Sequence, residues 1–128
     1  MTKEKFHLEY LLKTTSISIL WDAVSTPAGL EKWFADKVTT VDKNVEFYWG
    51  KNEMRSAKIT AIRTPLYIRF HWLDDEDERT YFQIKILMNE LTNDYVLEIT
   101  DFALSKEIDE SKSLWNSQIA GLRRNCGF

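Results

Sequence analysis

Residues Ser16 to Phe34, SISILWDAVSTPAGLEKWF, place two short helix patterns back to back in a chain that otherwise alternates like β-strands. The first pattern has apolar residues at positions i, i+3, i+4 and i+7, which form one stripe of a helix: Ile17, Leu20, Trp21 and Val24. Ser16 stands where a side-chain oxygen can cap the first free amides. The spacing predicts a helix over residues 16–25.

A second start signal follows at once. Thr26 can accept a hydrogen bond from the first free amides of a helix, and Pro27 is tolerated at its first position. Leu30, Trp33 and Phe34 then repeat the apolar spacing. We therefore expect a second, short helix that ends near residue 35.

The chain on both sides of this segment has the two-residue period of strands with one buried face. Strands are expected at about residues 6–12, 36–41, 45–49, 54–62, 66–73, 82–86 and 95–100. In the fourth of these, the period sends Ala57, Ile59 and Ala61 to the same, inward face.

The closing segment returns to a helical pattern. It carries acidic residues near its start at Glu107 and basic residues near its end at Arg123, which suits the helix dipole. Its apolar stripe is Trp115, Ile119, Leu122 and Cys126. The predicted order is one strand, two short helices, about six strands and a long helix.

This order resembles the helix-grip fold of the START-like, birch-pollen-allergen-like superfamily, and is most similar to the family related to the activator of a heat-shock chaperone's ATPase. Three motifs carry the resemblance: Leu20-Trp21 followed by the segment 26–34, then Pro65 with Ile68, Phe70 and Trp72, and then the helix from Trp115 to Leu122.

The resemblance covers nearly the whole chain and implies a single α+β domain over residues 1–128. In that fold, a curved antiparallel sheet of about seven strands wraps around a long C-terminal helix, with two short helices between strands one and two. Members of the superfamily commonly enclose an apolar cavity, and they include lipid and hormone binders, a few cyclases and hydrolases, and chaperone regulators. One fold with so many functions does not select one of them.

Composition restricts the class of protein. The 128 residues carry a net charge of −3, so a basic face for nucleic acid is not expected. The single cysteine, Cys126, has no partner for an internal disulfide, and the first residues lead into a strand pattern rather than an apolar signal core. No apolar run has the roughly 18 residues that a membrane span needs. We expect a cytoplasmic protein.

The candidate ligand site is the inward face of the sheet together with the long helix. Large apolar side chains with a few polar tips could orient a small hydrophobic ligand there. The candidate residues are Tyr10, Phe47, Trp49, Phe70, Trp72, Phe82, Ile84, Tyr95, Leu97, Trp115, Ile119 and Leu122. This hypothesis predicts a closed or slit-like pocket that touches Trp72, Phe82 and Trp115.

Two alternatives remain open. The same large side chains could fill the space, leaving a protein-interaction module that acts on a chaperone or as a homodimer. A cyclase- or hydrolase-like enzyme would need a titratable group inside the cavity, and both histidines, His7 and His71, fall on the outward register. No catalytic residue, metal ligand or cofactor is therefore assigned.

Three further features are expected to be structural. Charged residues that alternate with the inward set should form an ordinary solvated face. The acidic run 74–78 lacks the ligand spacing of a calcium loop, so we interpret it as a solvated hairpin tip. Cys126 continues a helix stripe and should pack rather than react.

Overall fold

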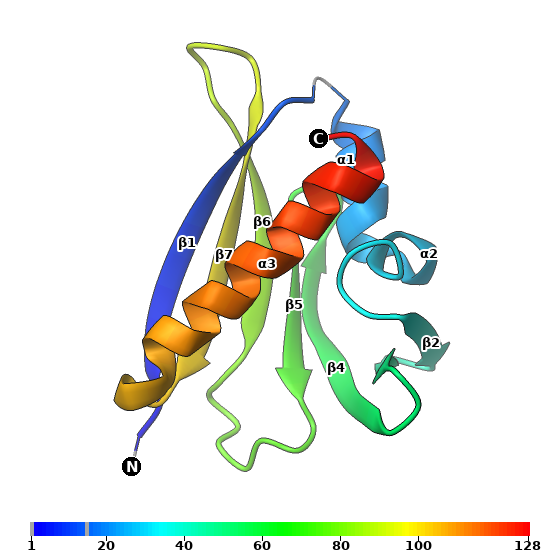
Figure 1. Cartoon of the computed structure of the whole chain (residues 1–128), viewed down its shortest axis with the longest axis vertical. Helices are drawn as coiled ribbons and strands as arrows, with labels where there is room; N and C mark the ends of the chain where they lie inside the picture. Colours follow the sequence, from blue (N-terminus) through cyan, green and yellow to red (C-terminus); the bar gives the residue numbers. More distant parts are fainter. Residues whose placement is uncertain (1, 15) are drawn as a thin grey trace.

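The computed structural model describes residues 2–14 and 16–128. Within these residues, seven strands form one antiparallel sheet in the order β1-β7-β6-β5-β4-β3-β2, and helix α3 lies across one face of this curved sheet (Figure 1). The elements are β1 (Glu4–Leu12), α1 (Ile17–Ser25), α2 (Pro27–Leu30), β2 (Lys37–Val41), β3 (Asn44–Trp49), β4 (Glu53–Arg63), β5 (Tyr67–Trp72), β6 (Phe82–Met88), β7 (Tyr95–Ala103), η1 (Ser105–Glu107) and α3 (Ile108–Cys126). The α+β helix-grip fold expected from the sequence is confirmed.

The two short helices begin at the predicted caps. The Ser16 hydroxyl accepts from the backbone N–H of Ile19 (3.3 Å), and the Thr26 hydroxyl accepts from that of Gly29 (2.9 Å). Gly29 also allows α2 to pack tightly on α1, because a Cβ at this position would lie 2.0 Å from the carbonyl oxygen of Asp22. Local capping and one close backbone contact therefore fix the helix pair.

The second helix is shorter than the sequence indicated. It ends at Leu30 and not near Ala35. Beyond it, the backbone N–H of Trp33 donates to the carbonyl of Leu30, only three residues back, in a tighter turn. The Trp33 indole N–H donates to the carbonyl of Ala23 in α1 (2.8 Å). This hydrogen bond joins α1 to the segment after α2. The helical spacing of apolar residues could not indicate it.

Alternation along the strands gives the sheet its buried face, with one correction. In β4, Ala57 pairs with Trp72 and Ile59 pairs with Phe70, as inward residues should. A register shift then intervenes, and Ala61 pairs with the outward residue Arg69. The expectation that Ala61 faces inward was wrong, because one extra residue in a bulge reverses every later side chain of the strand.

The core lies between the sheet and α3. Trp115, Ile119 and Leu122 are at most 5% exposed, and they form the predicted stripe of the helix. The helix ends at Gly127, whose positive φ of 75° suits a left-handed C-cap, and its N–H donates to the carbonyl of Arg123. In the part of the chain described, no helix has the length and apolar character to cross a membrane.

Candidate functional site

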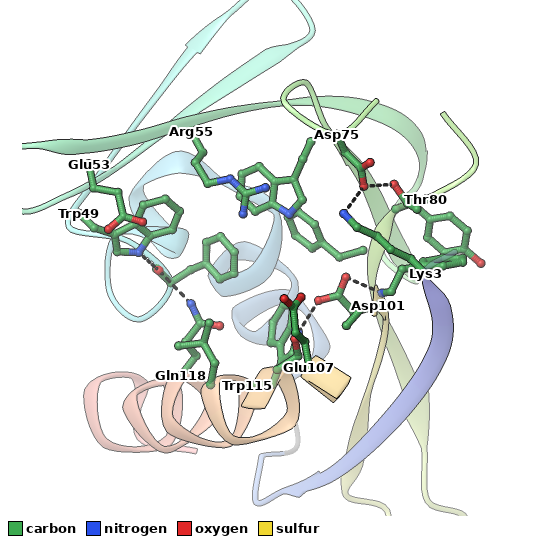
Figure 2. Close-up of a pocket in the computed structure, with 18 residues that line it drawn as sticks. Lys3, Trp49, Glu53, Arg55, Asp75, Thr80, Asp101, Glu107, Trp115 and Gln118 are labelled. Carbon is green, nitrogen blue, oxygen red and sulfur yellow. Dashed lines mark hydrogen bonds and ion pairs between the residues drawn. The ribbon is translucent and has the colours of Figure 1, made fainter. Parts of the chain in front are cut away.

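A pocket of about 470 Å³ opens between the first half of α3 and the sheet. Figure 2 shows side chains entering it from the helix, from the sheet and from the chain before β1. Ser111, Leu114, Trp115 and Gln118 contribute from the helix. The space between sheet and helix is therefore open at one end, where side chains fill it only partly. In Figure 1, this is the end at which β1 and α3 begin.

Four of the twelve candidate residues line this pocket: Trp49, Trp72, Phe82 and Trp115. Among them are Trp72, Phe82 and Trp115, the three side chains that the sequence predicted to touch a pocket. The pocket is not closed, since the exposed residues Glu53 and Glu107 also line it. Whether any of these side chains binds a ligand stays a prediction.

The other eight candidates do not line the pocket: Tyr10, Phe47, Phe70, Ile84, Tyr95, Leu97, Ile119 and Leu122. Most of them fill the core; Phe47, Ile84 and Leu97 are fully buried. Tyr10 donates its hydroxyl hydrogen to Asn116 of α3 (2.5 Å), and burial raises its pKa. Side-chain volume thus fills the inward face at these positions, and the pocket lies beside the first half of α3.

Phe34, the last residue of the helix-pair segment, belongs to the pocket wall. Its ring lies 5.6 Å from that of Phe82 and 5.8 Å from that of Trp115, measured between centroids. Its carbonyl oxygen accepts from the Trp49 indole N–H (2.8 Å) and from the Gln118 side chain (3.3 Å). The segment that decides the fold therefore also supplies and braces one wall of the pocket.

Asp101 is one of the pocket residues that sequence reasoning missed. It pairs with the inward residue Phe6, so its side chain faces the concave side of the sheet. Its Oδ2 accepts from the Trp115 indole N–H (2.8 Å), and its Oδ1 accepts from the backbone N–H of Phe102 (2.7 Å). Burial raises the pKa of Asp101 to about 6, although these two hydrogen bonds act in the opposite direction and lower it. The signal was present in the sequence, because the period of Tyr95, Leu97 and Ile99 continues two residues further.

Lys3 and Asp75 form an ion pair at the pocket, with 2.9 Å between Nζ and Oδ2. Thr80 also donates its hydroxyl hydrogen to Oδ2 of Asp75 (2.5 Å). Burial alone would raise the pKa of Asp75, but the hydrogen bonds from Lys3, Thr80 and the backbone of Asp77 outweigh burial and lower that pKa to about 2. The carboxylate is therefore ionised at neutral pH.

Arg55 is held on both sides. Its Nε and Nη2 each donate to one carboxylate oxygen of Asp74 (both 2.8 Å), and its guanidinium carbon lies 3.9 Å from the centre of the Trp72 ring. The hydrogen bond from Arg55 lowers the pKa of Asp74. The Trp72 ring thus already serves as a platform for a cation within the molecule.

The acidic run 74–78 is more than the solvated tip that we expected. Asp74, Asp75 and Asp77 pair with Arg55, Lys3 and Arg79 respectively. The Asp75 side chain is only 10% exposed. The expectation failed because the two cationic partners of Asp74 and Asp75 are brought to the turn by the tertiary fold from distant parts of the chain.

Both histidines lie on the outward register, as predicted. His7 pairs with Thr100, and its Nδ1 lies 2.9 Å from the Thr100 hydroxyl. His71 pairs with Lys58, and its Nδ1 lies 2.8 Å from the carbonyl oxygen of Thr80. Across residues 2–14 and 16–128, no three His, Cys, Asp or Glu side chains are grouped to hold a metal ion.

Comparison with solved structures agrees with this architecture. A protein from Bacteroides fragilis, solved by NMR, is 65% identical in sequence over 100% of this chain and 94% of its own, with a TM-score of 0.68. The Aha1 dimer from Colwellia psychrerythraea is 15% identical over 93% of this chain and 92% of that one, with a TM-score of 0.77. At that identity the likeness is one of fold alone.

A crystal structure from Mesorhizobium loti gives a similar result, with 14% identity over 94% of this chain and 95% of that one and a TM-score of 0.77. No curated protein matches the sequence. The model of a START-like superfamily domain matches residues 1–128. With this match over its full length and the fold described above, the chain belongs to the START-like superfamily.

Proposed function

We propose that this protein is a non-catalytic domain that binds a small hydrophobic ligand between the sheet and α3. The observation that carries the proposal is the pocket of about 470 Å³ with aromatic walls. Pockets for small molecules are typically about 300–1,000 Å³, mostly apolar, with a few placed polar groups. The rings of Phe34, Trp72, Phe82 and Trp115 would contact the body of such a ligand.

The polar contacts of Asp101 favour recognition over catalysis. Its hydrogen-bond donors are an indole N–H and a backbone N–H, and neither is a nucleophile or a second acid–base group. A carboxylate inside the pocket does keep proton transfer chemically possible. We place Asp101 in ligand orientation because its two hydrogen-bond partners include no second acid–base group or nucleophile, which leaves the catalytic set incomplete.

A pair of serines on α3 offers a sharp test. Ser111 lines the pocket, whereas Ser113 is exposed and does not line it. Binding of the neutral fluorescent probe N-phenyl-1-naphthylamine would be measured by titration. Ser111→Phe should fill the pocket and weaken binding about tenfold or more, a loss of about 1.4 kcal/mol, while Ser113→Phe should bind like the parent. Equal binding by both variants would contradict the proposal.

Native mass spectrometry of gently purified protein would identify a natural ligand. A bound small molecule that is absent from the Ser111→Phe variant would support the proposal. If parent and variant carry the same adduct, the adduct lies elsewhere.

A second candidate function is self-association through the outer face beside β1. This strand is an edge of the sheet, and its Leu11 is 45% exposed. Leu91, in the hairpin between β6 and β7, is 95% exposed. Apolar side chains beside an unpaired edge favour pairing with a second copy of the chain. This surface, and not the shared fold with an Aha1 dimer, is the reason to test it.

The measurement is solution mass over a range of concentrations. Self-association predicts a mass that rises with concentration and is reduced to that of a monomer by Leu11→Lys, but not by Leu66→Lys at a separate exposed site. A constant monomer mass for the parent protein would remove this candidate.

A cytoplasmic location is part of the proposal. Cys126 is the single cysteine and carries a free thiol, which is usual in a reducing compartment. Fractionation of the native cells would test this, and recovery in a secreted or periplasmic fraction would contradict it.

A further inference from the structure

We infer that the pocket selects an organic cation, a small molecule with an apolar or aromatic body and one protonated amine that pairs with Asp101. The inference rests on the proposed function and gives its ligand a chemical class. Three observations carry it: the charges around the pocket, the free capacity of the Asp101 carboxylate, and the aromatic walls.

The charges that face the pocket are mainly negative. Four carboxylates line it, on Glu53, Asp75, Asp101 and Glu107, against two cations, on Lys3 and Arg55. They come from the start of the chain, from β4, from the turn after β5, from β7 and from η1 (Figure 2). Charges of one sign in a cleft attract the opposite sign and repel their own. An anionic ligand would therefore meet net repulsion.

The two cations offset part of this negative charge, and both lower the pKa of Asp101, but each is already paired with an aspartate. Lys3 pairs with Asp75, and Arg55 is held by two hydrogen bonds to Asp74. Lys3 and Arg55 keep further N–H donors, but a fatty-acid carboxylate would have to share either cation with the aspartate that it already contacts. The surroundings thus disfavour the acidic lipid that an apolar pocket would otherwise suggest.

Asp101 can accept a further donor. Each carboxylate oxygen has two lone pairs. In Asp101, Oδ2 accepts one hydrogen bond from Trp115 and Oδ1 accepts one from Phe102. These two donors fix the orientation of the carboxylate. An ammonium group that enters the pocket can therefore form a charge-assisted hydrogen bond without displacing either donor.

The rings around Asp101 suit the same ligand. The Phe82 ring lies 5.0 Å from that of Trp72 and 6.0 Å from that of Trp115, between centroids. Indole and phenyl faces attract cations as well as apolar groups, and Arg55 already lies against Trp72 in this way. The body and the charge of an aromatic amine would both find contacts.

Three compounds that share a naphthalene ring test the inference: 2-naphthylmethylamine, 2-naphthylmethanol and 2-naphthylacetate. Dissociation constants come from titrations followed by the indole N–H signals in ¹H–¹⁵N NMR spectra, and the Trp115 signal reports contact at Asp101 directly. We expect the amine to bind about tenfold more tightly than the alcohol, and the acid to bind most weakly.

The matched variants change one charge on the same strand. Asp101→Asn should reduce the preference for the amine over the alcohol to about threefold or less. Glu98→Gln, on the outward face of β7, should preserve it, because Glu98 pairs with Lys85 on the far side of the sheet. Protonation of Asp101 should weaken amine binding by the parent protein below about pH 6. Amine binding by Asp101→Asn should not weaken in this way. Asp75 stays ionised through this range.

The outcomes separate the inference from the proposed function. If the three compounds bind equally, or the acid binds best, the pocket takes apolar ligands but the inference is wrong. If none binds while N-phenyl-1-naphthylamine still does, the inference is also overturned and the proposed function stands. A preference for the amine that survives in Asp101→Asn would overturn the assignment of Asp101.

Discussion

The two halves of α3 differ in what lies between the helix and the sheet. In the second half, Ile119 and Leu122 are completely buried, and neither lines the pocket. In the first half, Ser111 and Leu114 border the pocket instead, and Leu114 is 62% exposed. One helix thus closes the core at one end and forms the wall of an open site at the other.

The ends of the helix are also held differently. Near its C-terminus, Arg123 donates to the carbonyl of Leu11 (2.8 Å) and Asn125 donates to that of Lys32 (2.7 Å). In the first half, the Trp115 indole donates to the carboxylate of Asp101. The closed end uses neutral carbonyl acceptors at its surface and an apolar interior, whereas the open end places an ionisable group inside. The two halves of the same helix therefore differ in the polarity of the groups that hold them to the sheet.

The largest expected difference between the halves is in packing. Leu122→Ala should reduce the free energy of unfolding by about 2–5 kcal/mol, because it creates a cavity in the closed end. Leu114→Ala, the same change in the open half, should cost about 0.5 kcal/mol or less. Urea unfolding of both variants measures this. Similar losses in the two variants would mean that the halves do not differ in packing.

The next prediction concerns the bond between α3 and Asp101. Trp115→Phe keeps a ring but removes the indole donor, so the free energy of unfolding at neutral pH should fall by about 1.5–3 kcal/mol, as for hydrogen bonds to charged groups. Trp49→Phe, which removes a donor to the neutral carbonyl of Phe34, is the control and should lose about 0.5–1.5 kcal/mol. The loss in Trp115→Phe should shrink below about pH 6, where Asp101 is protonated. A loss independent of pH would contradict this contact.

The pH dependence of stability should identify the open end. The pKa of Asp101 is about 6 in the folded protein, above its ordinary value of 3.8, so the folded state favours the protonated form. This group therefore lowers stability above its folded pKa, and the penalty disappears as pH falls toward the unfolded value. Between about pH 7.5 and 4.5 the gain from Asp101 should be about 2 kcal/mol.

Asp101→Asn should remove this gain, so the difference in unfolding free energy between variant and parent should change by about the same 2 kcal/mol over that range. Asp75 acts in the opposite direction at lower pH, because its pKa is lowered to about 2; its contribution is lost as pH falls from the unfolded value toward about 2. A constant difference between parent and Asp101→Asn would show that the carboxylate is not buried as described.

The smallest expected effect is at the ion pair beside the pocket. Lys3→Ala removes the partner of Asp75, and since Lys3 is 37% exposed the loss of unfolding free energy should be under about 1 kcal/mol. The loss should decrease in high salt. Thermal unfolding at two salt concentrations measures this, and a loss of several kcal/mol would mean that the pair acts as part of the core.

Much of the fold could be predicted from local pattern. The caps at Ser16 and Thr26 act within a few residues, and the strand period identifies the buried face wherever no residue is inserted. Ala61 shows the limit of this reasoning, since a bulge changes the register without an obvious mark in the sequence. Trp33 shows another, because its indole bond to Ala23 depends on how α2 packs on α1.

The site was less predictable than the fold. The period identified the four candidate side chains that line the pocket, but it identified eight others that do not, because alternation assigns a face and not the amount of space above it. Asp101 lies on the same period, one residue beyond the strand predicted at 95–100, because β7 continues to Ala103. Lys3 and Asp75, which are 72 positions apart, had no local signal at all.

By itself, the sequence determined the two-helix interruption, the strand period and the apolar stripe of the last helix, because each depends on spacings of a few residues along the backbone. Only the tertiary structure decided that Phe34 becomes a pocket wall, that Asp101 receives the Trp115 indole and that one half of α3 stands over open space. These features depend on the volumes and charges of side chains that meet from distant segments, and short-range periodicity carries no information about such meetings.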